Sequence, residues 1–327
     1  MLWIPTDRAP EADFREGSGG ARVRPSVRRQ RRMPGVIIAL LGLLAGAAAQ
    51  AQSPSLPAIA QPATQEHHEG KVIFVQLVTP NLAQAQRFYG GLFGWTFQNL
   101  SVGGIAYSEA YLAGQPVAGM VERSVPTGVT KQSAWMSFIA APDVDAAKNL
   151  AVQHGAKVLF GPKDIPGRGR EVFLADPQGA PFAVLASSSG DPPDVLPEPG
   201  TWIWSSLIAQ DPDTDAAFYQ TLFKYEVFDL STDPSSEHLL LATENYARAS
   251  ANALPANRPH AHAHWMNYVR VDNADEATAK VSALGGRVLI PPHLDRHGGK
   301  VAVVADPLGA PFGLLEWTEN DSKEVSQ

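Results

Sequence analysis

The chain has 327 residues, a length at which two domains can each bury a core, and its 44% hydrophobic and 18% charged residues are typical of a globular protein. It has no cysteine, which excludes a disulfide framework, a thiolate zinc site and a cysteine nucleophile. Residues 1–52 hold eight of the 26 basic and four of the 33 acidic residues, so the rest of the chain has 18 basic and 29 acidic residues and a net charge of −11. This acidity argues against nucleic acid or an anionic membrane surface as a partner.

Residues 1–52 are expected to be a leader that contains a secretory signal peptide. A basic block at residues 28–32 precedes an apolar run of 14 residues, 36–49, and small residues follow at 49–51. This order is typical of a signal peptide, and the run is shorter than the roughly 20 residues that span a membrane comfortably. We therefore expect a periplasmic or secreted protein with no membrane contact after cleavage. An uncleaved anchor is the alternative.

The rest of the chain follows one plan twice. A β-branched strand from residue 72 precedes an amphipathic helix from residue 82, and short strands separated by Gly-rich turns come next. A second strand, helix and set of strands complete the first domain, and the same order returns in the second. The predicted segments are a flexible linker at 53–70, a first domain at 71–186, a Pro-rich linker at 187–200, a second domain at 201–317 and a polar tail at 318–327.

An internal repeat supports this division. Residues 175–185 and 305–315 are identical at eight of eleven positions, at an offset of 130. The same offset matches Phe88 and Tyr89 with Phe218 and Tyr219. A weaker pattern at an offset of 62 divides each domain again, so the chain contains four similar modules paired two by two.

The paired strand–helix–three-strand modules carry two motifs, FY-x2-LF in the first helix and DP-x-GA-x-F in the last hairpin. In both features the chain resembles the vicinal oxygen chelate superfamily, which includes glyoxalase I, extradiol dioxygenases and bleomycin-resistance proteins. The resemblance implies an α+β fold in which four βαβββ modules pair into two glyoxalase-like domains with cupped mixed sheets.

The resemblance also implies a divalent metal, held in such enzymes by His or Glu on the first strand of each module and by Glu on the last strand. The matching positions here hold Phe74, Trp204, Trp135 or Met136, Trp265 or Met266, Ala183 and Gly313. None of these side chains is a good ligand for a hard cation. Glu122 lies near a matching point, but one carboxylate does not make a site. We therefore predict no cofactor and keep a divalent metal as the alternative.

The same positions favour an apolar cup on each domain. Aromatic rings can bind an organic molecule by stacking and by burying its surface. The expected cup-lining residues are Phe74, Trp135, Trp204 and Trp265, with Arg170 and Lys300 reaching over the cups from equivalent loops toward an anionic group. In the alternative interpretation the rings fill the barrels, and Arg170 and Lys300 only mark the start of a strand without contacting a ligand.

Five further polar residues need an interpretation. His260, His262 and His264 alternate, so on a strand they would share one face and could bind zinc, copper or nickel. The alternative is an exposed loop that leads into the strand. Asp176 and Asp306 begin the DP-x-G turns, and we expect them to stabilise those turns rather than to catalyse.

The sequence thus predicts an exported protein that binds a small organic molecule in aromatic cups without the usual metal. Two other functions remain open. One is a metal-dependent glyoxalase-like lyase or dioxygenase with unusually placed ligands, and the other is a structural or interaction protein with filled cups.

Overall fold

The computed structural model describes residues 55–124, 133–232, 238–254, 262–295 and 299–317. These residues form four helices and two sheets of eight strands each. The first sheet contains, in spatial order, β2 (Thr96–Val102), β3 (Ile105–Leu112), β4 (Gln115–Glu122), β1 (Val72–Thr79), β5 (Ala134–Ala140), β8 (Pro181–Ser187), β7 (Gly169–Ala175) and β6 (Lys157–Ile165). The second contains β10 (Glu226–Asp229), β11 (His238–Thr243), β12 (Tyr246–Ala253), β9 (Trp202–Ala209), β13 (His264–Val271), β16 (Pro311–Glu316), β15 (Lys300–Ala305) and β14 (Arg287–Leu294).

Each sheet joins two modules at its centre. Within a module the first strand pairs in parallel with the last, as β1 does with β4 and β5 with β8. The two first strands, β1 and β5, pair with each other in antiparallel fashion, and β9 pairs with β13 in the same way. The predicted α+β fold with four βαβββ modules is therefore confirmed.

The helices are α1 (Leu82–Phe93), α2 (Val144–Gln153), α3 (Pro212–Phe223) and α4 (Ala274–Ala283). Each begins after an Asn or Asp whose side chain accepts a hydrogen bond from a backbone N–H three residues later, and these caps are Asn81, Asp143, Asp211 and Asn273. The caps satisfy N–H groups that have no partner within the helix, which explains why the same polar position recurs in every module.

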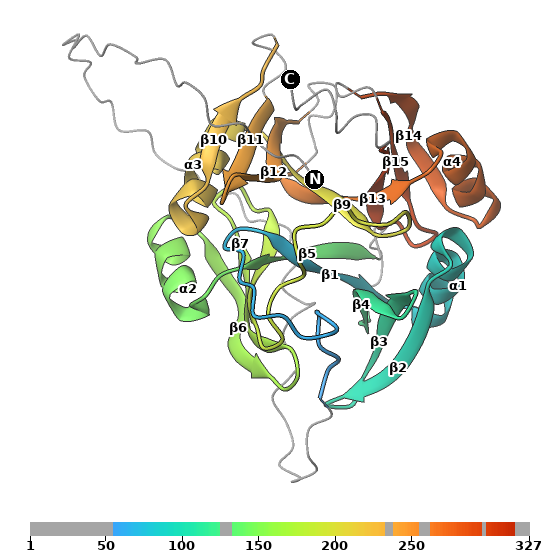
Figure 1. Ribbon diagram of the computed structural model, residues 1–327, viewed down its shortest axis with the longest axis horizontal. Helices are drawn as coiled ribbons and strands as arrows, with labels where there is room; N and C mark the ends of the chain where they lie inside the picture. Colours follow the sequence, from blue (N-terminus) through green and yellow to red (C-terminus); the bar gives the residue numbers. More distant parts are fainter. Residues whose placement is uncertain (1–54, 125–132, 233–237, 255–261, 296–298, 318–327) are drawn as a thin grey trace.

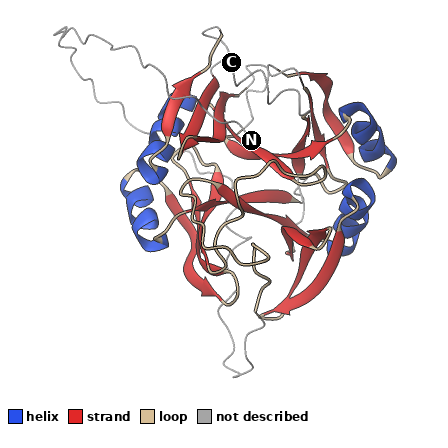
Figure 2. Ribbon diagram, viewed as in Figure 1, coloured by secondary structure: helices blue, strands red, loops and turns tan. Residues whose placement is uncertain are grey.

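The two curled sheets lie back to back, and their concave faces open in opposite directions (Figure 1). Helix α1 lies beside α4 on one flank, and α2 lies beside α3 on the other (Figures 1 and 2). Two apolar cores therefore form between the domains. One packs the first module against the fourth, with Leu77, Phe88 and Phe312 buried together. The other packs the second module against the third, with Phe182 and Leu241 buried together.

The repeated motifs meet across the domain boundary. The Trp135 indole donates from Nε1 to the Tyr89 hydroxyl at 3.0 Å, and that hydroxyl donates to Oδ2 of Asp306 at 3.3 Å. The same arrangement recurs for Trp265, Tyr219 and Asp176, at 2.9 Å and 3.1 Å. Each helix tyrosine thus contacts the DP-x-G turn of the other domain, so the two motifs hold the duplicated halves together.

The segment before β1 is packed against the domains rather than flexible, which corrects the expectation from its composition. Within residues 55–70, the Leu56 N–H donates to the Pro166 carbonyl at 2.8 Å and the Thr64 N–H donates to that of Ser189 at 2.8 Å. Ile59 is only 4% exposed. The Pro-rich linker supplies several partners of this segment, so the two polar stretches stabilise each other. No helix in the described ranges is long and apolar enough to cross a membrane.

Candidate ligand-binding site

The concave face of the second sheet opens into a cavity of about 1150 Å³. Trp204 of β9, Ser250 of β12 and Tyr268 of β13 line its floor. Tyr268 and Trp204 are direct partners in the β9–β13 register, so their side chains stand next to each other on the same face. The floor therefore offers two neighbouring aromatic groups to a ligand.

A polar row crosses this floor. Nδ2 of Asn252 donates to Oγ of Ser250 at 3.0 Å, and Oγ of Ser250 lies 2.8 Å from Oγ of Ser206. Trp204 donates from Nε1 to Ser250 at 3.2 Å, and Nδ1 of His238 contacts Oδ1 of Asn252. Hydroxyl groups can both donate and accept, so this row can exchange hydrogen bonds with a polar substituent on an otherwise apolar molecule.

The position of Tyr268 depends on a glycine. Tyr268 pairs with Gly313 of β16, and a Cβ atom on Gly313 would lie 1.9 Å from Cδ1 of Tyr268. The tyrosine ring can therefore occupy its place only because position 313 has no side chain. Burial raises the pKa of Tyr268, while a hydrogen bond with Ser206 acts in the opposite direction. The hydroxyl is thus neutral at physiological pH.

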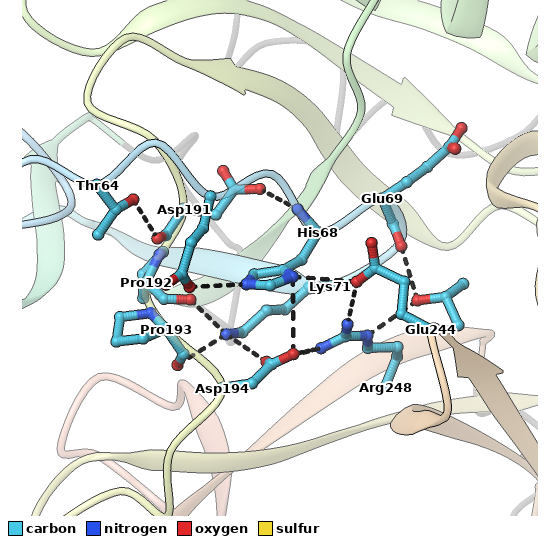
Figure 3. Close-up of polar contacts among 12 residues, drawn as sticks. Thr64, His68, Glu69, Lys71, Asp191, Pro192, Pro193, Asp194, Glu244 and Arg248 are labelled. Carbon is cyan, nitrogen blue, oxygen red and sulfur yellow. Dashed lines mark hydrogen bonds and ion pairs between the residues drawn. The ribbon is translucent and has the colours of Figure 1, made fainter.

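The segment before β1 and the interdomain linker form a side wall of the cavity, with Ile59, Pro192 and Val195 among the lining residues. An ionic network holds this wall to β12 and the turn before it (Figure 3). Asp194 of the linker lies at its centre, 2.7 Å from Nζ of Lys71 and 2.7 Å from Nη1 of Arg248.

The charges of the basic and acidic side chains in this network nearly cancel. Arg248 also contacts Glu244 at 2.6 Å, and its side chain is 1% exposed. Burial alone would raise the pKa of Asp194, but hydrogen bonds from Lys71 and Arg248 outweigh burial and hold it below the usual value. Burial lowers the pKa of Lys71 despite its contact with Asp194.

His68, Asp194 and Glu244 present one ligand atom each within 4.8 Å of one another, which is a geometry that could hold a metal ion. Nδ1 of His68 lies 3.0 Å from Glu244 and 3.6 Å from Asp194. Arg248 already binds both carboxylates, and Lys71 binds Asp194 as well (Figure 3). A metal ion would have to displace these cations, so the set fits an ionic clamp better than a metal centre.

The concave face of the first sheet is filled. Its cavity measures about 80 Å³. The guanidinium carbon of Arg168 lies 4.1 Å from the Phe74 ring centre, and Nη2 of Arg168 donates to Glu109 at 2.7 Å and to the Tyr107 hydroxyl at 3.1 Å. By strand register, Leu240 of the second domain takes the place of Glu109. The buried ion pair is therefore specific to the first domain.

Only two of the four predicted aromatic residues, Phe74 and Trp204, line these cavities. The expectation for Trp135 and Trp265 was wrong, because both lie on the helix side of their sheets. Trp135 pairs with Leu77 and points into the same core. Alternate residues of a strand face opposite sides, so a shift of one position in alignment moves a side chain from the cup to the core.

The expected roles of Arg170 and Lys300 were also wrong. Each forms an ion pair with an aspartate in the first turn of its own module's helix, Arg170 with Asp145 at 2.6 Å and Lys300 with Asp275 at 2.5 Å. Both therefore point away from the cups. Arg168 lines the cup instead, from the turn just before β7, which begins at Gly169 with φ 126°.

The other predicted polar residues have structural contacts. Oε2 of Glu122 accepts the Leu82 N–H at the start of α1, at 3.1 Å, and so acts as a cap. Asp176 accepts the N–H groups of Gln178 and Ala180, as expected for a turn residue. Asp306 accepts two N–H groups in the same way.

The three predicted histidine ligands are not brought together by the described part of the chain. His260 lies outside the described residues. His262 is exposed in the segment before β13, and its carbonyl contacts Nδ1 of His264 at 2.8 Å. The imidazole of His264 is therefore held by the backbone of His262.

The positions implied by the resemblance do not fit a metal ion. In β4, Gly119 pairs with β1 as Gly313 pairs with β13, and a Cβ on Gly119 would lie 2.1 Å from the Tyr107 hydroxyl and 2.9 Å from Phe74. Gly313 is covered in the same way by Tyr268. Aromatic rings therefore occupy the space that a ligand carboxylate would need, and no set of nitrogen and oxygen ligands converges at these positions.

Comparison with known proteins agrees with this fold and its pairing. Residues 71–184 match the model of the Glyoxalase/Bleomycin resistance protein/Dioxygenase superfamily, and residues 205–315 match that of the Glyoxalase-like domain. The chain is 32% identical over 265 residues to the putative glyoxylase CFP32 of Mycobacterium tuberculosis, an alignment that covers 78% of this chain and 98% of that protein. The chain belongs to the vicinal oxygen chelate superfamily.

This tandem member of the superfamily is also similar to a second relative in sequence and to a solved structure in fold. It is 28% identical over 266 residues to the anthracycline biosynthesis protein DauV of a Streptomyces species, covering 76% of this chain and 94% of DauV. Its fold is similar to that of the Mn(II)-bound glyoxalase from Novosphingobium aromaticivorans, with a TM-score of 0.55 at 14% identity, covering 77% of this chain and 84% of that one.

Proposed function

We propose that this protein binds a small organic molecule in the cavity of its second domain, without a metal ion. The observation that carries the proposal is the contrast between the two concave faces. The second has a cavity of about 1150 Å³, and the first has one of about 80 Å³ because Arg168 and its partners fill it. Large apolar cavities with a few convergent polar groups are the usual places for small ligands.

The floor of the cavity defines the chemistry of the ligand. An aromatic ring can pack on Trp204 and Tyr268, with about 25 cal/mol gained per Å² of apolar surface buried. Hydroxyl or carbonyl substituents can pair with Ser206, Ser250 and Asn252. DauV is named for anthracycline biosynthesis, and this name supports an organic ligand with aromatic rings for the present chain.

Binding without a metal ion is supported by the side chains at the superfamily's ligand positions. Phe74, Trp204 and Gly313 offer no atom there that could bind a metal ion. The carboxylate of Asp194, which belongs to the group with His68, is already paired with Arg248 and Lys71. The rival function is a metal-dependent lyase or dioxygenase that uses the His68, Asp194 and Glu244 group. A stoichiometric metal in the purified protein would favour that rival.

We also propose that the protein is exported to the periplasm or secreted. The support is the order of basic, apolar and small residues within 1–52, which lie outside the described residues. An N-terminus at or near residue 52 in the protein recovered from the producing cells would agree with cleavage, whereas a full-length protein in the membrane fraction would indicate an anchor.

Thermal-shift screening tests the proposed binding. Purified protein is treated with a chelator, screened against aromatic compounds that carry hydroxyl or carbonyl groups, and screened again after addition of Zn²⁺ or Mn²⁺. We expect stabilisation by some compounds in the chelated state, because a ligand that binds only the folded protein raises its stability. Compounds that act only in the metal-loaded state would favour the enzyme, and no response at all would favour a structural protein.

A further inference from the structure

The small cavity of the first domain has an unusual combination of walls. Its polar lining comes from Gln76 of β1, Tyr107 of β3, Glu171 of β7 and the loop residue Arg168. The remaining wall is mostly apolar and consists of Leu56, Phe74, Val102, Ile105, Val121, Phe138 and Ile165, with Arg123 also present. The cavity is thus polar on one side and aliphatic or aromatic on the other.

Within the described residues, only some of the N–H groups of the Arg168 guanidinium have a hydrogen-bond partner. Nη2 donates to Glu109 and Tyr107, but Nη1 is buried and has no hydrogen-bond partner. The Arg168 side chain is 2% exposed and lines the cavity. Buried donors are almost always paired, so a charged N–H group left free beside a cavity points to an acceptor that enters it.

The charges around the cavity favour an anion as that acceptor. Arg168 and Arg123 contribute two cations, and Glu109 balances one of them. Burial raises the pKa of Glu171 to about 7, although Arg168 and Lys163 act in the opposite direction. When Glu171 is protonated, the surroundings therefore carry a net positive charge, which one negative group can neutralise.

Size and wall composition narrow the class of ligand. An apolar cavity of about 150 Å³ can hold benzene, so the space of about 80 Å³ suits a molecule of three or four non-hydrogen atoms. We propose that the first domain binds a short-chain monocarboxylate, with its carboxylate on Nη1 of Arg168 and its alkyl end against Ile105 and Val121. This site shares only Phe74 with the second-domain cavity and does not rest on the function proposed for it.

Such binding should depend on pH in a defined direction. The groups that face Glu171 are Arg168, Lys163 and Tyr107, and Arg123 lines the same cavity. Protonated Glu171 can donate a hydrogen bond to a bound carboxylate, whereas ionised Glu171 repels it. Binding should therefore be tighter at pH 6 than at pH 8.

Isothermal titration with sodium formate and sodium acetate, against sodium chloride of equal ionic strength, tests the proposal. We expect saturable binding at pH 6 that weakens several-fold at pH 8, and a loss of this pH dependence in Glu171→Gln. Arg168→Lys should weaken binding by tenfold or more, because lysine lacks the second N–H arm. The matched control is Arg170→Lys, which changes the same residue type two positions later on the outer surface and should leave binding unchanged.

Filling the cavity provides a second route if Arg168→Lys does not fold. Ile105→Phe leaves the ion pair intact and should abolish acetate binding, while Trp204→Ala in the other domain should preserve it. The proposal is overturned if neither carboxylate binds the unaltered protein at either pH, or if Ile105→Phe binds acetate as tightly as the unaltered protein. A crystal structure grown with acetate that shows only water at Nη1 of Arg168 would also overturn it.

Discussion

The guanidinium of Arg168 lies 4.1 Å from the centre of the Phe74 ring, whereas the equivalent ring of the second domain, that of Trp204, borders an open cavity. The two domains share one strand order but differ in what covers the first strand. A buried ion pair fills the first cup, because Arg168 also binds Glu109 at 2.7 Å. Duplication has thus produced one filled cup and one open cup.

Breaking the buried ion pair should destabilise the first domain. Glu109→Ala leaves the Arg168 charge buried without its partner, and such losses amount to about 3–5 kcal/mol. The double variant Glu109→Leu with Arg168→Leu copies Leu240 at one position and removes both charges, so it should recover most of the loss. Urea unfolding measures both effects. If Glu109→Ala unfolded at the same urea concentration as the unaltered protein, the pair would have no structural role.

The contacts between domains should contribute equally in both halves. Tyr89→Phe removes the hydroxyl that joins Trp135 to Asp306, and Tyr219→Phe does the same in the other core. Each change should lower the free energy of unfolding by about 1–3 kcal/mol, because buried polar partners lose their hydrogen bonds. The two losses should add in the double variant, since the residues lie in different cores. Strong non-additivity would show that the cores are coupled.

Asp215 of α3 should make stability depend on pH. It is fully buried, and burial followed by repulsion from Asp176 raises its pKa from 3.8 to about 7. Because the folded state holds the proton more tightly, the contribution to stability is present below pH 3.8 and is lost as pH rises to about 7. Asp215→Asn cannot ionise, so it should be more stable than the unaltered protein at pH 8, by up to about 4 kcal/mol, and similar at pH 4. Thermal melts at both pH values measure this difference, and equal stability at pH 8 would contradict the prediction.

The ionic clamp should control the wall of the second-domain cavity. Asp194→Asn leaves Arg248 and Lys71 without their shared carboxylate, so residues 55–70 and the linker should detach more often. We expect faster proteolysis in these two stretches, with the cores of the sheets still protected. Lys224→Ala is the matched control, because its exposed ion pair with Glu69 also anchors this segment but contributes little. Equal cleavage rates in Asp194→Asn and the unaltered protein would contradict the clamp.

The fold could be predicted from the sequence because its evidence is local and repeated. The DP-x-G turns and the capped helices each depend on residues that are close together in the chain, and both features recur at an offset of 130. The contacts of the repeated tyrosines could not be predicted, because Tyr89 meets a turn more than two hundred residues away.

The candidate site was less predictable, because side-chain direction depends on register and on single backbone angles. Two alignments of the β5 strand place either Trp135 or Met136 in the cup, and only the pairing of Trp135 with Leu77 decides between them. Arg168 and Arg170 look equivalent in the sequence, but Arg168 lines the first-domain cavity whereas Arg170 pairs with Asp145 of α2. The packed segment before β1 has a flexible composition, but contacts to the distant linker fix it.

The most direct test of metal-free ligand binding is an isothermal titration of chelator-treated protein with an aromatic compound identified by screening. We expect saturable binding by the unaltered protein without metal, a loss of at least tenfold in affinity for Trp204→Ala, and unchanged affinity for Ile105→Phe, which alters only the small cavity of the first domain. Binding that requires added metal, or that Trp204→Ala leaves intact, would contradict it.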